Sequence, residues 1–434
     1  MTQILEADII DLSHDGRGVA RVDGKTVFIA GALPGERVRA RRTQRHRNFD
    51  EAKVEELLTR SADRIEPRCP HFGGCGGCSL QHLPPDKQIQ AKQRVLAENF
   101  ERIGKVSPQR WLAPLTGEPW GYRRKGRLSV KWVAKKDKAL VGFREDNPRF
   151  VADLSQCHTL LPEVGLRIAA LGDLVGSLEM KRDIAQIEVA AGDDTVALTI
   201  RHLQPLPESD RAALVAFGQA HGLAILLQPG GPDSVVPLWP GAVALSFRLP
   251  DYGLDIAFQP LDFIQVNAGM NQRMIRHALD LLEPRAGESV LDLFCGLGNF
   301  TLPIARSAGR VTGVEGEAAL VARSRANAQR NGIDNVEFFA ADLAADQREA
   351  PWARAHHDKL LLDPPRSGAA AVLDYLPRKG CDRVVYVSCH PGSLARDAGI
   401  LVERHGFELV AAGVMDMFPH TAHVESIALF KRSG

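Results

Sequence analysis

The sequence predicts a multidomain α/β protein in three parts: an N-terminal OB-like β-barrel, a central α+β domain and a C-terminal Rossmann-like domain. Three observations support this prediction. Five short strand-like segments fill residues 1–60, a cysteine–glycine stretch follows at 69–78, and four apolar runs after residue 289 end at glycines or acids. A chain of 434 residues accommodates two or three domains.

The composition limits the cellular compartment and the binding partners that we expect for this protein. The net charge is +1, so any contact with nucleic acid must come from local basic clusters. No apolar run reaches membrane-spanning length, and the N-terminus does not resemble a signal peptide. We expect a cytoplasmic monomer without membrane contact, in which the seven cysteines act as ligands or nucleophiles rather than in disulfides.

Residues 1–60 are predicted to form the barrel. Asp23-Gly24 lies between two strand-like segments and is typical of a two-residue hairpin turn. Arginines are dense just beyond it, with Phe49 nearby for base stacking, which favours RNA binding. The alternative is a pair of solvated, charged strands. The arginines are Arg37, Arg39, Arg41, Arg42, Arg45 and Arg47.

Residues 61–258 form the predicted central domain, whose strongest signal is Cys69-Pro-His-Phe-Gly-Gly-Cys75-Gly-Gly-Cys78. Three cysteines among glycines indicate cluster ligands, and Cys157 is the nearest candidate for a fourth thiolate. Zinc is the rival, with His71 or His158 as the fourth ligand. The cysteine spacing alone does not distinguish an iron–sulfur cluster from a zinc ion.

A second basic stretch follows in the same domain. With Trp120, Tyr122 and Trp132 interleaved, it is interpreted as an RNA grip or as an exposed strand face. We also expect part of residues 84–120 to pack on the catalytic domain. The basic residues are Arg123, Arg124, Lys125, Arg127 and Lys131.

Residues 259–434 are predicted to bind a nucleotide-like cofactor. The run Val290–Leu293 forms a buried strand, and Gly296 and Gly298 open the turn to a helix. A third glycine is missing, which disfavours a dinucleotide site. The following strands end near acids, at the sheet edge where such ligands bind. Those acids are Glu315, Asp342 and Asp363.

Two further residues are candidates for catalysis at that edge. Cys389 ends a fifth strand just before a helix, where the helix dipole favours a thiolate nucleophile. Glu425 begins the last strand and could act as a base in the same cleft. A buried inert thiol and a surface carboxylate are the alternatives.

Several motifs together resemble a known family. Gly16–Gly24 and Gly31–Val38 resemble a TRAM domain, an RNA-binding barrel. With the cysteine set, Asp363-Pro-Pro-Arg366, Ser388-Cys389-His390-Pro391 and His423-Val-Glu425, nearly the whole chain resembles the RumA/RlmD-type uracil-C5 methyltransferases of bacterial 23S ribosomal RNA. One difference is His390, because the family usually has asparagine there.

The resemblance implies a role for each candidate residue. The cysteines 69, 75, 78 and 157 would hold a [4Fe–4S] cluster, Cys389 would be the nucleophile and Glu425 the base. The implied contacts of S-adenosylmethionine are Gln265, Phe294, Asn299, Glu315, Asp342 and Asp363.

The expected activity is methylation of C5 of uridine 1939 in 23S ribosomal RNA, through addition of the cysteine to uracil C6. The alternative is another ribosomal site or a transfer RNA. Two rival classes are an iron–sulfur oxidoreductase with a nicotinamide and a catalytically idle RNA-binding factor. The missing third glycine counts against the first, and the cysteine–glutamate pair counts against the second.

Overall fold

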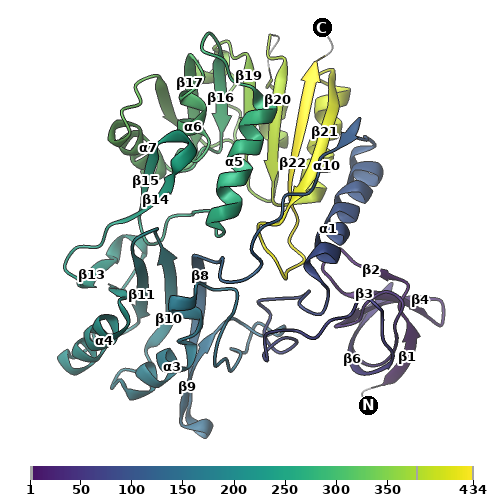
Figure 1. The fold of residues 1–434 in the computed structure, drawn as a ribbon, viewed down its shortest axis with the longest axis vertical. Helices are drawn as coiled ribbons and strands as arrows, with labels where there is room; N and C mark the ends of the chain where they lie inside the picture. Colours follow the sequence, from purple (N-terminus) through teal and green to yellow (C-terminus); the bar gives the residue numbers. More distant parts are fainter. Residues whose placement is uncertain (1–2, 378–379, 433–434) are drawn as a thin grey trace.

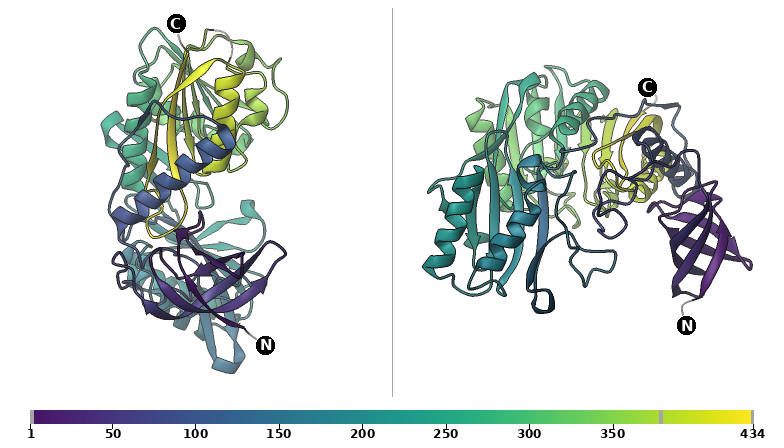
Figure 2. Two further views of the ribbon diagram at one scale, coloured as in Figure 1. Left: turned by 90° about the vertical axis from the view of Figure 1, so that its right-hand side faces the viewer. Right: turned by 60° about the horizontal axis from the view of Figure 1, so that its bottom comes forward.

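The structure, a computed structural model, describes residues 3–377 and 380–432. Residues 1–2 of the predicted barrel and residues 378–379 and 433–434 of the predicted C-terminal domain lie outside the described residues. Three β-sheet bodies follow one another along the chain (Figure 1). The barrel carries the N-terminus, the central sheet lies beside it, and the largest sheet sits above both with the C-terminus at its far end (Figure 1). Figure 2 shows the barrel and the central sheet as separate bodies.

The barrel is a six-stranded sheet with the order β1-β5-β6-β4-β3-β2. Asp23 and Gly24 both have positive φ angles, which confirms the predicted hairpin turn between β3 and β4. The predicted strands are present, and the short β2 is an addition that the sequence did not indicate. The strands are β1 Ile4–Asp8, β2 Asp11–Leu12, β3 Gly18–Val22, β4 Lys25–Ala30, β5 Arg37–Arg45 and β6 Phe49–Thr59.

The central sheet has the order β13-β12-β11-β10-β8-β9 and is antiparallel except for the β11–β12 pair. Apolar residues of helices α3 and α4 pack with its strands in one core, as Leu171 and Leu214 illustrate. Its strands are β8 Lys125–Val133, β9 Lys138–Gly142, β10 Ile184–Ala191, β11 Val196–His202, β12 Ala224–Gln228 and β13 Val236–Trp239. Its helices are α2 Pro162–Gly165, α3 Ile168–Ser177 and α4 Glu208–His221.

The large sheet has the order β18-β17-β16-β19-β20-β22-β21-β7. Its first five strands are parallel, whereas β22 runs antiparallel to both neighbours. The strands are β16 Ser289–Leu293, β17 Arg310–Glu315, β18 Val336–Ala340, β19 Lys359–Leu362, β20 Arg383–Ser388, β21 Phe407–Met415, β22 Glu425–Arg432 and β7 Arg110–Trp111.

Six helices accompany this sheet, and the hairpin of β14 Leu245–Leu249 and β15 Leu254–Phe258 leads into it. In Figure 2 the helices lie on both faces of the sheet, the arrangement of an open α/β fold. The helices are α5 Ala268–Leu282, α6 Thr301–Ala305, α7 Ala318–Arg330, α8 Pro351–Arg354, α9 Ala370–Leu373 and α10 Pro391–Glu403.

One earlier segment of the chain belongs spatially to this sheet. Helix α1, Pro85–Asn99, continues into a π-helical turn at Phe100–Gly104 and packs against α10 and β21 (Figure 2). Leu96 and Phe100 share a buried core with Leu394 of α10. Among the described residues, no helix combines the length and apolarity needed to cross a bilayer.

Candidate functional site

The predicted nucleophile and base face each other across two neighbouring strands. In the register of β20 and β22, Ser388 pairs with Ser426, and the Ser426 hydroxyl donates to the Ser388 carbonyl at 3.0 Å. The ladder ends at this pair, and Cys389 and Glu425 are the next residue on each side of it, close enough for the Glu425 carboxyl to raise the pKa of the Cys389 thiol. Because β22 is antiparallel, its first residue lies at the same sheet edge as the carboxyl ends of the parallel strands.

The Cys389 thiol is half-buried, and this burial raises its pKa to about 11. The nearby carboxyl groups of Glu425 and Asp363 act in the same direction, and the Arg366 guanidinium opposes them. The prediction that the helix dipole favours the thiolate is therefore wrong for the protein without RNA. Desolvation outweighs the helix terminus, so the thiol is protonated at neutral pH.

Glu425 is 4 % exposed, and its carboxyl group makes no hydrogen bond or ion pair with any described residue. Burial raises the pKa of its carboxyl well above the usual value, Asp363 raises it further, and Lys92 lowers it. Burial also raises the pKa of Asp363 to about 7. A buried carboxyl group without a partner is poised to exchange a proton with a ligand.

The loops beside Cys389 are fixed by polar contacts. Arg366, in the turn after β19, contacts the Nδ1 atom of His423 at 3.0 Å. His390 is the N-cap of α10, where its Nδ1 atom accepts a hydrogen bond from the Ser393 backbone at 3.1 Å. An asparagine oxygen makes the same kind of cap. His390 therefore supplies the capping interaction that the family's usual asparagine would make.

The predicted cofactor contacts gather around the first glycine turn. Phe294 has a positive φ of 65°, and the Gly296 backbone donates to the Glu315 carboxylate at 3.1 Å. This strained turn brings the end of β16 to the end of β17, which is the usual position of a bound nucleoside.

The remaining contacts extend this site at both ends. Asn299 exchanges two amide hydrogen bonds of 2.9 Å with Asn271, which lines a small cavity together with Gln265. Asp342 is exposed and lies beyond the end of β18. Asn271 was not predicted, because it lies inside a helix and has no motif around it.

Asp292 begins the glycine-turn motif of the sequence, but it was not predicted as a site residue. It is fully buried on β16, where the Thr301 hydroxyl donates to one carboxylate oxygen at 2.5 Å. Burial raises its pKa to about 8, and its other oxygen has no partner among the described residues. The polar residue within the run Val290–Leu293 was the signal that could have identified it.

Cys389 opens into a cleft of about 840 Å³, within the size range of ligand sites. The barrel supplies residues 11–15, Val19 and Phe28 to its walls, and α1 supplies another wall. Gly76, Gly77 and Ser79, from the cysteine–glycine stretch and the residue after it, also line the cleft. Segments far apart in the sequence thus meet around the predicted nucleophile.

The four predicted metal ligands line a second, small pocket. Burial raises the pKa of Cys75 to about 11 and that of Cys78 to about 12, and Cys157 contributes to both shifts by its proximity. The Gly77 backbone donates to the Cys75 sulfur at 3.4 Å. Within residues 3–377 and 380–432, no three histidine, cysteine or acidic side chains are arranged to hold a metal ion.

Several side chains of the two basic stretches make contacts within the protein. On the barrel, Arg39 pairs with Glu6 and Glu56, and Arg42 pairs with the buried Asp50. In the second stretch, Arg124 pairs with Asp193 and the Lys125 ammonium contacts the Pro260 carbonyl. These two side chains hold segments of the protein together, and RNA contact by the second stretch stays a prediction. Within it, Arg127 and Lys131 are exposed.

Comparison with known proteins agrees with this architecture. Residues 248–433 match the model of the tRNA (uracil-5-)-methyltransferase family, and residues 2–54 match the TRAM domain. The structure of Pyrococcus abyssi tRNA (uracil-54, C5)-methyltransferase with S-adenosyl-L-homocysteine has a TM-score of 0.74 at 23% identity, covering 98% of this chain and 100% of that one.

Two curated relatives are similar over nearly their whole length, and both are named 23S rRNA (uracil(1939)-C(5))-methyltransferase RlmD. The protein of Xanthomonas euvesicatoria is 66% identical, with coverage of 98% of this chain and 96% of that one. The protein of Stenotrophomonas maltophilia is 64% identical, with coverage of 98% and 97%.

The fold and the site define a methyltransferase with an added N-terminal TRAM barrel. More narrowly, the chain belongs to the RlmD family of 23S rRNA (uracil-C5)-methyltransferases.

Proposed function

We propose that this enzyme transfers a methyl group from S-adenosylmethionine to C5 of uridine 1939 in 23S ribosomal RNA, through a covalent adduct between Cys389 and uracil C6. The observation that carries this proposal is that Cys389, which lines the cleft, lies beside the buried carboxyl of Glu425 where β20 ends and β22 begins. The names of the curated relatives supply the uridine.

Each residue has a separate step in this reaction. Uracil C5 is a poor nucleophile, and addition of the Cys389 sulfur to C6 gives an enolate with electron density at C5. When bound, S-adenosylmethionine supplies an electrophilic methyl group. The Glu425 carboxylate then takes the C5 proton, which re-forms the double bond and expels the cysteine. Because burial raises the pKa of both the Cys389 thiol and the Glu425 carboxyl in the free protein, each group must lose a proton before it acts.

For the cofactor, we propose contacts with the six predicted residues. Glu315 and Asp342, at neighbouring strand ends, would accept hydrogen bonds from the ribose and the adenine. Phe294 and Asn299 lie in or beside the glycine turn, Gln265 lies before α5, and Asp363 lies between the cofactor edge and Cys389.

For the cysteine pocket, we propose a [4Fe–4S] cluster held by Cys69, Cys75, Cys78 and Cys157. Four thiols line the pocket, and backbone amides point at their sulfur atoms, as at iron–sulfur sites. The zinc alternative with His71 is less well supported, because its Nε2 atom already accepts a hydrogen bond from the Ser155 backbone at 3.0 Å.

For RNA binding, we propose that the cleft-facing side of the barrel stacks bases. Phe28 lines the cleft, Phe49 packs edge-on to it at 5.5 Å, and His46 stacks on Phe49 at 4.2 Å. Such aromatic surfaces bind single-stranded RNA by stacking. We propose that the enzyme acts as a monomer in the cytoplasm. Light scattering of the purified protein would test its oligomeric state.

Transfer of tritiated methyl groups tests the substrate. A 23S ribosomal RNA fragment containing uridine 1939 should be labelled, and the same fragment with cytidine at that position should not. Label in the cytidine fragment would indicate another ribosomal site, and label in a transfer RNA transcript would support the alternative substrate. Absence of label in all three RNAs would overturn the proposed function.

A further inference from the structure

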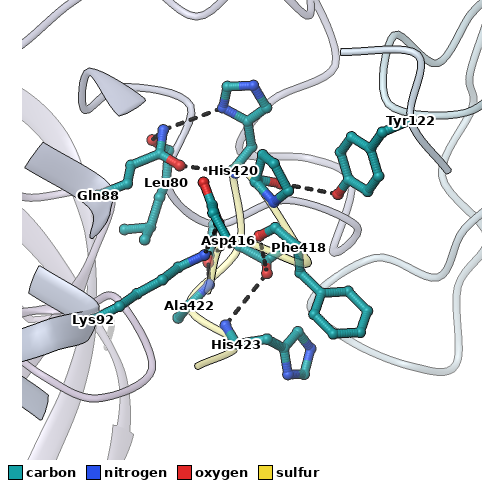
Figure 3. A network of polar contacts seen from close by, with 12 residues as sticks. Leu80, Gln88, Lys92, Tyr122, Asp416, Phe418, His420, Ala422 and His423 are labelled. Carbon is teal, nitrogen blue, oxygen red and sulfur yellow. Dashed lines mark hydrogen bonds and ion pairs between the residues drawn. The ribbon is translucent and has the colours of Figure 1, made fainter. Parts of the chain in front are cut away.

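A buried polar network holds the connection between β21 and β22, residues 416–424, which ends where Glu425 begins (Figure 3). Helix α1 supplies two of its side chains, Gln88 and Lys92, which lie one turn apart on the same face. Figure 3 shows both pointing from the helix into this connection. The network thus joins a helix from early in the chain to the strand that carries the proposed base.

Lys92 is the only cation among the groups placed around Glu425 in the described part of the chain. Its side chain is 2 % exposed, and its ammonium group donates to Asp416 at 2.7 Å and to the Phe418 carbonyl at 3.0 Å. Asp416 directly follows Met415, which is paired with Glu425 in the β21–β22 ladder. Lys92 therefore fixes the backbone next to the base.

Gln88 holds the same connection without a charge. Its amide nitrogen donates to His420 Nδ1 at 3.1 Å, and its amide oxygen accepts from the His420 backbone at 2.8 Å. Trp120 stacks on the His420 ring at 3.8 Å. Gln88 and Lys92 are thus matched in position and in target, and they differ in charge.

We propose that Lys92 is a positioning residue for the methyltransferase reaction: it orders the connection before Glu425, and its positive charge lowers the cost of ionising the Glu425 carboxyl when that group removes the C5 proton. This inference rests on the proposed function.

The groups that face Glu425 come from three elements. They are Asp363 after β19, Cys389 after β20 and Lys92 on α1, and only Lys92 lowers the Glu425 pKa. Asp416 neutralises part of the Lys92 charge, and His423 is engaged by Arg366. A nearby cation stabilises the charged form of a buried carboxyl group. Because Lys92 lies on α1 and pairs with Asp416, the Glu425 carboxyl has no direct ion-pair partner among the described residues.

The test is the pH dependence of adduct breakdown in single-turnover reactions with the 23S fragment, followed on denaturing gels. In Lys92→Met, loss of the cation should raise the Glu425 pKa, so the midpoint of release should move to higher pH by about one unit or more. Lys92→Arg should keep the parent midpoint, and high pH should rescue Lys92→Met. Gln88→Met should slow the reaction without moving the midpoint.

Lys92→Met leaves Asp416 buried without its partner, and that variant could fail to fold. The double variant Lys92→Met/Asp416→Leu removes both charges, a replacement that buried pairs often tolerate. Its midpoint should move in the same direction, because Lys92 and not Asp416 acts on Glu425. Unmoved midpoints in these variants would overturn the role of Lys92. Absence of any adduct in the parent enzyme would instead overturn the proposed function.

Discussion

The two cysteine sites of this protein show how differently one residue type can be used. Cys389 and Cys75 have almost the same raised pKa, about 11, and burial is the main cause in both. Their neighbours differ: Cys389 faces carboxyl groups and an arginine at an open cleft, whereas Cys75 faces other thiols in a small pocket. The surrounding groups, rather than the thiol's own acidity, distinguish a nucleophile from a ligand.

The largest effect should come from removing the nucleophile. Cys389→Ala should abolish both methyl transfer and the covalent adduct, while thermal unfolding and S-adenosylmethionine binding remain as in the parent. Calorimetry and adduct gels measure these properties. The matched control is Cys381→Ala, because Cys381 is buried just before the opposite end of β20. Methylation by Cys389→Ala at the parent rate would remove Cys389 from the mechanism.

The second effect concerns the other cysteine site. Anaerobically purified protein should be brown with about four irons per chain, and Cys75→Ser should lose the colour and the iron. Its unfolding temperature should fall, because the cluster would join Cys157 to the stretch 69–78. Cys389→Ala is the control, and its iron content should equal that of the parent. A colourless parent with one zinc ion per chain would refute the cluster.

The third effect tests the raised pKa of the Cys389 thiol. Alkylation requires a thiolate, so modification of Cys389 by iodoacetamide should be slow at neutral pH and should rise about tenfold per pH unit up to about pH 11. Arg366→Gln removes a charge that lowers the Cys389 pKa, so alkylation at a given pH should slow further. Peptide mass spectrometry measures both rates. Rapid alkylation of Cys389 at pH 7 would contradict the raised pKa.

The smallest effect should come from the barrel. Arg42 anchors the buried Asp50, so the exposed Arg41 and Arg47 are better probes of RNA contact. The Arg41→Glu/Arg47→Glu variant should bind RNA more weakly, with a log–log salt slope flatter by about one unit per lost phosphate contact. Arg211→Glu, on α4 of the central domain, is the control for a general loss of charge. Filter binding at several salt concentrations measures this slope. A slope equal to that of the parent would contradict RNA contact by these arginines.

Local patterns predicted the elements that carry their own signal. The strands β16 to β20, the Asp23-Gly24 turn and the clustering of four distant cysteines around one pocket followed from apolar runs, turn residues and spacing. These features depend on residues close in sequence or on a chemistry that few arrangements satisfy.

Contacts between distant segments could not be predicted in the same way. Lys92 and Asp416 are 324 residues apart, and nothing in either local sequence indicates that they pair. The basic stretch at Arg124 has the composition of an RNA-binding surface, but its partner Asp193 lies in another strand connection. The pKa of Cys389 likewise depends on how deeply the fold buries it, which the helix that follows does not reveal.

The most direct test of the account uses the 23S fragment with 5-fluorouridine at position 1939. Fluorine at C5 cannot leave as a proton, so methylation should proceed and release should stall, with Cys389 bonded to C6. Mass spectrometry of the adduct should place the RNA on Cys389, and Glu425→Gln should accumulate the same adduct even with natural uridine. No trapped adduct, a cross-link at another residue, or full turnover by Glu425→Gln would contradict the proposed division of roles.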